Sequence, residues 1–276
     1  MRNRNKLVVA TYNLQFSLHL EEVKDNILSM VGMGVNLFCL QEVINKTGKV
    51  SVIELLLNEL GSNWRAVCNL GTKKTILGMG NCIIWNTNVL TLKKEQKEFL
   101  PIYNRLGIHE KIFSWFAGGT TAPFQRRVII GQFKLNEAEI RITNLHLDQN
   151  GGLMNRRKQL LYLMNILRKN KFSKEIICGD FNSFDLLKKG KEAKMQKNIL
   201  GNNFIDASRK SGWTADLNDI YFEKGSRFLT FLIKNMRVHV RRKLDYIWIK
   251  NIKCLRCDKL LLNGSDHNPI IVYLEV

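Results

Sequence analysis

Six segments of this chain place polar or ionisable side chains where an apolar, strand-like run ends or begins. In chain order they carry Asn13, Glu42, His146, Asp180 with Asn182, Asp245, and Asp266 with His267. Taken singly, each has an ordinary structural explanation, such as a turn residue, a surface acid or a buried histidine. Together they are better explained by a site, because the sites of α/β proteins form where strand ends converge.

The oxygen-bearing members of this set match the ligands of a hard divalent cation. Mg²⁺ prefers oxygen ligands, keeps several waters, and needs only one or two protein carboxylates beside a substrate phosphate. Glu42 is the first candidate ligand, and Asn13, Asp266 or Asp180 are candidates for further oxygens. We therefore expect a Mg²⁺ site in which Mn²⁺ is an acceptable substitute.

The other residues suit the transfer of a phosphoryl group to water. An aspartate paired with a histidine orients the imidazole and stabilises its protonated form, and Asp245 with His267 is a candidate pair. Asp180 and Asn182 lie two residues apart at one strand end, so both side chains point the same way. Asp180 would activate a water while Asn182 holds a phosphate oxygen. Groups that neutralise developing charge are the usual means of catalysing this reaction.

Strand-like and helix-like segments alternate along the whole chain. We expect strands over Leu7–Asn13, Val35–Glu42, Asn81–Trp85, Arg127–Leu135, Ile140–His146, Glu175–Asp180, Leu244–Ile249 and Pro269–Leu274. Ser51 and Glu54 form a capping box that opens a helix over Val52–Leu60, and a leucine and methionine stripe indicates a helix over Met154–Lys169. No repeat or linker interrupts the pattern, which predicts a single α/β domain over residues 1–276.

The chain is strongly basic, with 43 Lys and Arg against 24 Asp and Glu and a formal net charge of +19. The composition excludes a disordered or collagen-like chain. Such a charge favours polyanionic partners, either nucleic acid or an anionic membrane surface. Aromatic side chains in polar segments, among them Trp213, stack on bases unless they are buried. Candidate phosphate contacts are Arg126, Arg127, Arg156, Arg157, Arg241, Arg242 and Lys243.

Membrane and export signals are weak in this sequence. No stretch reaches the roughly 18 consecutive apolar residues of a membrane-spanning helix, and the basic first residues lack the apolar core of a signal peptide. The six cysteines are scattered and several lie in apolar runs, so we expect reduced core thiols. Cys254 and Cys257 form one isolated C-x-x-C pattern, which favours a structural role. These features predict a cytoplasmic protein and carry no signal for an oligomeric state.

The order and spacing of the motifs resemble the endonuclease/exonuclease/phosphatase superfamily, which includes deoxyribonucleases, sphingomyelinases and inositol polyphosphate 5-phosphatases. The matching segments are Thr11–Leu14, Leu40–Val43, Gly80–Ile84, Asn144–Leu147, Gly179–Asn182, Leu244–Tyr246 and Ser265–His267. The resemblance implies a four-layer α/β sandwich, with two packed mixed β-sheets flanked by helices and the site at one edge. It also implies metal-dependent cleavage of a phosphate ester by an activated water, without a covalent intermediate.

For the metal and the water, the resemblance implies a role for each matching residue. Glu42 corresponds to the main metal ligand and is assisted by Asn13. Asp266 completes the metal and water environment. Asp180 and Asn182 correspond to the pair that activates the water and orients the phosphate.

For the phosphate, the resemblance implies roles for both histidines. His267, oriented by Asp245, corresponds to a phosphate-binding or general-base histidine. His146 corresponds to the histidine that assists the phosphate or the leaving group in the deoxyribonuclease and sphingomyelinase branches. Which histidine donates a proton and which accepts one stays open at this point. Arg127 lies where relatives often place a phosphate contact.

The function we expect is that of a Mg²⁺-dependent phosphodiesterase, either a nuclease (endonuclease or exonuclease) or an enzyme that processes DNA or RNA ends, with Arg241 and Arg242 among its substrate contacts. The alternative is a sphingomyelinase-like or phosphoinositide-directed enzyme that works on anionic lipid. A non-catalytic nucleic-acid-binding module fits less well, because the motif residues are intact. An apurinic-site endonuclease is disfavoured, because Val43 follows Gln41-Glu42 where those enzymes continue with Thr or Ile and then Lys.

Overall fold

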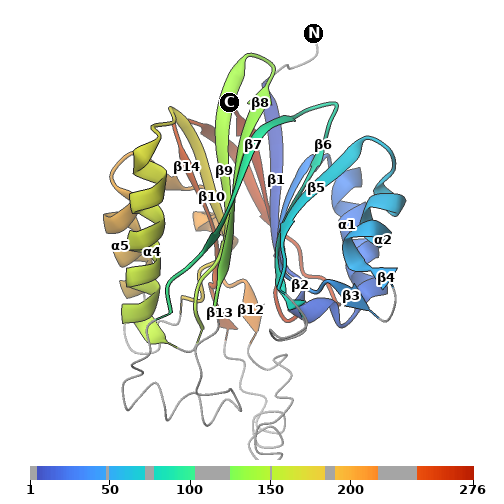
Figure 1. Ribbon diagram of the computed structural model, residues 1–276, viewed down its shortest axis with the longest axis horizontal. Helices are drawn as coiled ribbons and strands as arrows, with labels where there is room; N and C mark the ends of the chain where they lie inside the picture. The colour runs from blue at the N-terminus through green and yellow to red at the C-terminus, as the bar shows by residue number, and fades with distance from the viewer. Residues whose placement is uncertain are drawn as a thin grey trace, which may run out of the picture.

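Two six-stranded β-sheets pack face to face and carry helices on their outer surfaces (Figure 1). The structure, a computed structural model, describes residues 5–47, 50–71, 78–102, 125–149, 151–183, 190–216 and 241–276. The layers run helix, sheet, sheet, helix across the molecule. The expected four-layer α/β sandwich with two mixed sheets is therefore confirmed.

The first sheet has the strand order β15-β16-β1-β2-β6-β5. Its strands are β1 (Lys6–Asn13), β2 (Leu37–Val43), β5 (Trp64–Asn69), β6 (Gly80–Asn86), β15 (Lys253–Lys259) and β16 (Ile270–Glu275). Strands β1 and β2 are parallel and every other pair is antiparallel. The C-terminal strand thus lies beside the N-terminal one.

The second sheet has the order β11-β14-β10-β9-β8-β7. Its strands are β7 (Thr91–Phe99), β8 (Arg127–Leu135), β9 (Ala138–His146), β10 (Lys174–Asp180), β11 (Phe204–Asp206) and β14 (Asp245–Lys250). Here β9 and β10 are the parallel pair. Two short ribbons complete the strands, β3 (Lys46–Thr47) with β4 (Val50–Ser51) and β12 (Ala215–Asp216) with β13 (Arg241–Arg242).

Each sheet has its own pair of helices. Helices α1 (Leu20–Gly32) and α2 (Val52–Leu60) cover the first sheet, and α4 (Gly152–Lys169) and α5 (Lys191–Leu200) cover the second. Short 3₁₀ turns η1 (Gln15–Ser17) and η3 (Arg209–Ser211) follow β1 and β11. The apolar stripe of each helix packs on the outer face of its sheet, as amphipathic helices do.

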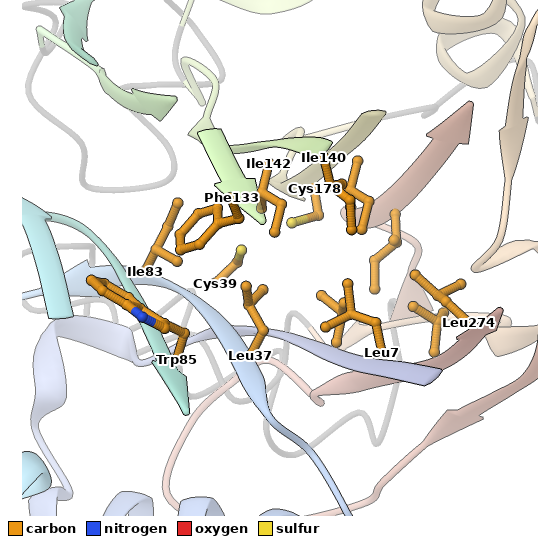
Figure 2. Close-up of a cluster of buried hydrophobic side chains, with 14 of the residues drawn as sticks. Leu7, Leu37, Cys39, Ile83, Trp85, Phe133, Ile140, Ile142, Cys178 and Leu274 are labelled. Atoms are coloured by element: carbon orange, nitrogen blue, oxygen red, sulfur yellow. The ribbon is translucent and has the colours of Figure 1, made fainter. Parts of the chain in front are cut away.

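The alternation of side chains along the strands builds the core between the sheets. On β1, Leu7 and Val9 point between the sheets while Val8 and Ala10 lie under the helices. Figure 2 shows side chains of both sheets meeting in this core, with Cys39 of the first sheet facing Cys178 of the second. Rings of the two sheets also meet there, as the edge-to-face contact of Trp85 with Phe133, 5.3 Å between centroids, illustrates. Burial of these apolar faces is what holds the sheets together.

All eight expected strands are present, with ends that differ from the expected ones by at most two residues. The helix over Val52–Leu60 has the expected bounds, and Ser51 Oγ accepts a hydrogen bond from Glu54 N over 3.4 Å. The helix expected over Met154–Lys169 begins at Gly152. Strands β5, β7, β11 and β15 and helices α1 and α5 were not among the expected elements. Most of β7 is exposed and charged, as suits an edge strand, so its sequence lacks the alternation that marks a half-buried strand.

Two cysteines correct the expectation that all six are reduced. Cys68 on β5 and Cys82 on β6 form a disulfide, with their Cα atoms 4.1 Å apart. The antiparallel register of β5 and β6 places the two residues directly opposite one another. Because disulfides are rare in cytosolic proteins, this one weighs against the expected cytoplasmic location. The free thiols are those of Cys39, Cys178, Cys254 and Cys257.

Within the described ranges, no helix has the length and apolar character needed to cross a membrane. The expectation of one domain over residues 1–276 stays a prediction, because parts of the chain lie outside those ranges.

The disulfide gives a direct test of the pairing of β5 with β6. We expect unreduced, denatured protein to present four reactive thiols and fully reduced protein six. Cys82→Ser removes a cross-link between residues 14 apart, which we expect to lower the free energy of unfolding by about 3 kcal/mol in urea titrations. Cys254→Ser, at a free thiol, is the control and should cost less than about 1 kcal/mol. Six reactive thiols before reduction would contradict the pairing.

Candidate active site

The strand ends that carry the predicted acids, amides and histidines lie at one end of the sandwich, the lower end in Figure 1. Each sheet contains one parallel pair, and those four strands all end there. Asn13 ends β1, His146 ends β9 and Asp180 ends β10. Antiparallel neighbours begin at the same end, so Asp245 lies opposite Asp180 and His267 comes just before β16. Convergence of strand ends thus gathers residues from across the whole chain.

A hydrogen bond joins the two sheets inside this group. Asn13 Nδ2 donates to Asp180 Oδ2 over 3.0 Å. The loop before β16 is held against the end of β1, because Ser265 Oγ donates to the Asn13 carbonyl over 2.7 Å. The backbone N–H of Asp266 also donates to Gln15 Oε1 over 3.2 Å. These bonds bring Asp266 beside residues more than two hundred positions earlier in the chain.

Two site residues have left-handed backbone conformations. Glu42 has a φ of 55° and Asn182 a φ of 48°. Glu42 lies where the register between β2 and β6 shifts, so its side chain does not follow the alternation of the strand. The turn at Asn182 is held by its N–H, which donates to Asp180 Oδ1 over 2.8 Å. Such conformations cost on the order of 1 kcal/mol or more each and are common at functional sites.

Beneath the site, a buried amide pair bridges the sheets. Gln41 Nε2 donates to Asn144 Oδ1 over 2.7 Å, and both side chains are fully buried. Asn144 Nδ2 donates in turn to the carbonyls of Leu40 and Cys82, over 2.9 and 2.8 Å. Gln41 precedes Glu42 and Asn144 lies two residues before His146 on β9. The bridge therefore sets the spacing between groups that different sheets contribute.

His267 is surrounded by carboxylates. Its Nδ1 lies 2.8 Å from Asp245 Oδ2, and its Nε2 lies 3.9 Å from Asp180 Oδ2. Burial alone would lower the pKa of His267, but the charges of Asp245, Asp266 and Asp180 raise it well above its ordinary value. Thr214 Oγ1 supports the pair by accepting the N–H of Asp245 over 3.1 Å. The arrangement favours an imidazolium that offers Nε2–H to the site.

His146 has the opposite environment. Arg126 Nη1 lies 3.2 Å from its Nδ1, and a guanidinium can only donate. Nδ1 is therefore the acceptor and Nε2 carries the proton, facing Asp180 Oδ2 at 3.4 Å and Glu42 Oε1 at 3.8 Å. Burial, with the charges of Arg126 and His267, holds the pKa of His146 well below its ordinary value. It remains neutral and acts as a hydrogen-bond donor.

The carboxyl groups of the site are crowded and shielded from solvent. Burial raises the pKa of Asp180 to about 6, and the charge of Asp245 adds to the shift. Burial likewise raises the pKa of Asp266 to about 6, with the charge of Glu42 contributing. The pKa of Glu42 is also raised, by burial and by Asp180, although Arg126 opposes it. Without a further cation, this group of acids resists full ionisation.

These observations fit a divalent cation bound by oxygen. Asp180, Asp245 and His267 bring ligand atoms within 4.8 Å of one another, although a protonated His267 offers no lone pair to a metal, so the carboxylates are the available ligands of this group. Within the described part of the chain, the buried Asp245 Oδ1 has no hydrogen-bond partner. A bound cation would relieve the repulsion between Glu42, Asp180 and Asp266. Carboxylate and amide oxygens suit Mg²⁺ or Mn²⁺ better than a soft metal.

Arg127, Arg241 and Arg242, which were predicted to contact substrate, bond to residues outside this cluster. Arg127 donates to Asn69 Oδ1 over 3.1 Å and covers the ring of Phe99. Arg241 pairs with Asp216 on the β12–β13 ribbon, and Arg242 donates to a backbone carbonyl of the same ribbon. Their role in substrate binding stays a prediction.

Other basic candidates have structural partners. Arg156 is buried and bonds Glu192 through two nitrogens, which removes it from the candidate contacts. Lys243 pairs with Asp206 at 2.8 Å. Arg126 is the basic residue that touches the site, through His146. No motif spacing singles out Arg126, because its contact depends on the pairing of β8 with β9.

The supporting residues Gln15, Gln41, Asn144 and Thr214 are not among the predicted site residues. Gln41 and Asn144 lie within the matching motifs. An amide side chain inside an apolar strand was the sequence signal that could have identified them. Gln15 and Thr214 act through side-chain bonds to backbone N–H groups that only the folded chain brings near.

No protein-family model and no curated protein matches this sequence, whereas many solved structures match its fold. An endonuclease/exonuclease/phosphatase from Bacteroides vulgatus has a TM-score of 0.67 at 16% identity, over 98% of this chain and 99% of that one. D. rerio TDP2 complexed with a single-strand DNA product has a TM-score of 0.67 at 15% identity, over 98% and 99%. A mannosyl-6-phosphatase from Bacteroides thetaiotaomicron has a TM-score of 0.66 at 16% identity, over 97% and 99%.

The amide bridge predicts a large effect from one buried substitution. Asn144→Ala removes the acceptor of Gln41 and leaves two buried carbonyls without their donor. We expect a loss of about 3 kcal/mol in the free energy of unfolding, measured by urea titration. Asn165→Ala, on the exposed side of α4, is the control and should change it by less than about 0.5 kcal/mol. Equal effects of both substitutions would show that the bridge contributes little.

Proposed function

We propose that this chain, which has the fold of the endonuclease/exonuclease/phosphatase superfamily, is a divalent-metal-dependent phosphodiesterase that hydrolyses nucleic acid. The observation that carries the proposal is the convergence of Glu42, Asp180 and His267 at one end of the sandwich, where Asn13 bonds Asp180 across the sheets. The group combines carboxylates, amides, one protonated histidine and one neutral histidine. Such groups can activate a water and stabilise the charge that develops when a phosphate ester is hydrolysed.

Nucleic acid is the favoured substrate because of charge. A formal net charge of +19 attracts an extended polyanion more strongly than a small monoester. The neighbouring structures include both a protein with a DNA product and a sugar phosphatase, so the fold alone does not select the substrate. The charge of this chain therefore supports the choice of the polymer.

Glu42, Asn13 and Asp266 are the residues we assign to the metal. Glu42 is the second-last residue of β2, at the register shift. Asp266 is held beside Asn13 by the loop before β16. When bound there, Mg²⁺ or Mn²⁺ supplies positive charge to the phosphate and lowers the pKa of a coordinated water. The raised pKa values of Glu42 and Asp266 indicate that this cation also stabilises the ionised acids.

The other residues act on the water and the phosphate. Asp180, as a carboxylate, accepts a proton from the attacking water, and the oxygen of that water bonds to phosphorus. The ester oxygen leaves with the electron pair of the broken bond. Asn182 orients a phosphate oxygen from the adjacent turn. His267, kept charged by Asp245, donates from Nε2 to the phosphate and neutralises charge that develops on it. His146, fixed by Arg126, donates a hydrogen bond from Nε2 without changing its charge.

Hydrolysis of defined substrates tests the function. With Mg²⁺ we expect cleavage of a labelled oligonucleotide that EDTA abolishes, and no turnover of sphingomyelin or a phosphoinositide. Asp180→Asn keeps the shape but removes the base, so we expect kcat to fall by about 10²- to 10⁴-fold. Asp25→Asn, at an exposed position on α1, is the control for the lost charge and should retain activity. Turnover of lipid alone, or cleavage that EDTA does not reduce, would contradict the proposal.

The pKa shifts predict how the metal stabilises the protein. Asp180 and Asp266 have pKa values raised to about 6, so without metal they favour folding below pH 3.8 and lose that contribution as the pH rises through 6. Mg²⁺ binds the ionised form, and protons compete with it below pH 6. We therefore expect Mg²⁺ to raise Tm more at pH 7.5 than at pH 5, as measured by differential scanning calorimetry.

The control for this measurement is Glu42→Gln, which removes the main assigned ligand. That variant should lose most of the Mg²⁺-dependent rise in Tm at pH 7.5. An equal rise at both pH values, or an undiminished rise in the variant, would argue against a metal on these carboxylates.

A further inference from the structure

A second cluster of cations lies on the β12–β13 side of the molecule, around the ring of Trp213. Lys259 Nζ lies 3.7 Å from the centroid of this ring, and the guanidinium carbon of Arg241 lies 4.4 Å from it. Lys259 also donates to the carbonyl of Trp213 over 2.8 Å. One half-buried indole therefore holds two cationic side chains in place.

The charges of this cluster are not balanced by its neighbours. Arg241 pairs with Asp216 at 3.2 Å, but no carboxylate among the described residues lies within ion-pair distance of Lys259. Burial, and then the nearby charge of Arg241, lower the pKa of Lys259. Two cations packed on one ring repel each other, and an anion bound between them would remove that repulsion.

The cluster lies next to the candidate active site. The residue after Trp213, Thr214, accepts the backbone N–H of Asp245. Ala215 forms an isolated bridge with His267, and the N–H of Asp216 approaches the carbonyl of Asp266 at 3.4 Å. The β12–β13 ribbon, which carries Arg241 and follows Trp213, is thus attached directly to the segment that carries Asp266 and His267.

We propose that Trp213, Arg241 and Lys259 form a second phosphate subsite, which binds a backbone phosphate of a single nucleic-acid strand beside the phosphate being cleaved. This inference rests on the proposed function for the identity of the ligand. It assigns the cluster to substrate selection: a polymer with several phosphates occupies both sites, whereas a compound with one phosphate occupies only the acidic site.

Pre-organisation makes this cluster a better phosphate site than an ordinary surface lysine. A free lysine loses side-chain entropy when it is fixed on a ligand, which weakens binding. Here the indole and the Trp213 carbonyl already hold Lys259, and the indole and Asp216 hold Arg241. An anionic membrane is the less suitable partner, because the Trp213 ring is covered by cations and is not offered for insertion between lipids.

Binding without turnover tests the subsite directly. The probe is a fluorescent ten-residue single-stranded DNA, and its anisotropy is measured with the full chain in EDTA over a range of salt concentrations. For Lys259→Gln we expect five- to ten-fold weaker binding and a salt slope that is smaller by about 0.7 in magnitude, as loss of one phosphate contact predicts. Arg241→Gln is the second variant and should act in the same direction.

Lys253→Gln is the matched control, since it removes the same charge from the exposed, opposite end of β15. It should leave the affinity and the slope within two-fold of the unchanged chain, and thermal melts of all variants establish that they fold. Equal affinities for the Lys259 and Lys253 variants would overturn the subsite. A Lys259 variant that loses binding only to phosphatidylserine vesicles would also overturn it, in favour of a membrane surface.

Hydrolysis separates this inference from the proposed function. Bis(4-nitrophenyl) phosphate carries one phosphate, so the ratio of kcat/KM for the oligonucleotide to kcat/KM for this diester should fall about five-fold or more in Lys259→Gln. A chain that cleaves both substrates with an unchanged ratio in the variant would lack the subsite but keep the function. A chain that cleaves neither substrate, yet loses DNA binding in the variant, would keep the subsite and lose the function.

Discussion

The bond between Gln41 and Asn144 is the interaction on which the rest of the site depends. The two amides lie on different sheets and are fully buried, and the hydrogen bond between them is 2.7 Å long. An apolar pair at this position would leave the sheets free to slide. Apolar packing is non-directional and sets only the separation of the layers, whereas a buried hydrogen bond has one geometry that satisfies it. The bridge therefore fixes the register between the sheets, and with it the spacing of Glu42 from His146.

Above this bridge, the protein assembles a group of acids that is unfavourable by itself. Glu42, Asp180 and Asp266 have raised pKa values because burial disfavours their charge and because each has a carboxylate neighbour whose charge adds to the shift. Buried acids with raised pKa values lower the stability of a fold, and they are common at functional sites. The left-handed conformations of Glu42 and Asn182 add to the same cost. The cation and phosphate of the proposed function would offset this cost, and the stability of the fold comes from the apolar layers around the site.

The two histidines differ in protonation because they have different partners. Asp245 keeps a proton on both nitrogens of His267, whereas Arg126 leaves His146 with one. The sequence predicted Asp245 as the partner of His267, 22 residues away. It did not connect Arg126 with His146, 20 residues away, and that contact decides the protonation of His146.

The sequence by itself determined the class of fold, through the order of its motifs, the eight strands with clear apolar patterns, and the polar residues that the strand ends bring together. It could do so because side-chain alternation and strand-end motifs are local properties, set by neighbours along the chain. Tertiary structure decided the Cys68–Cys82 disulfide, the charged edge strand β7, the contact of Arg126 with His146, and the cations around Trp213. Each of these depends on which strands pair and in what register, and that follows from packing of the whole chain, not from any one segment.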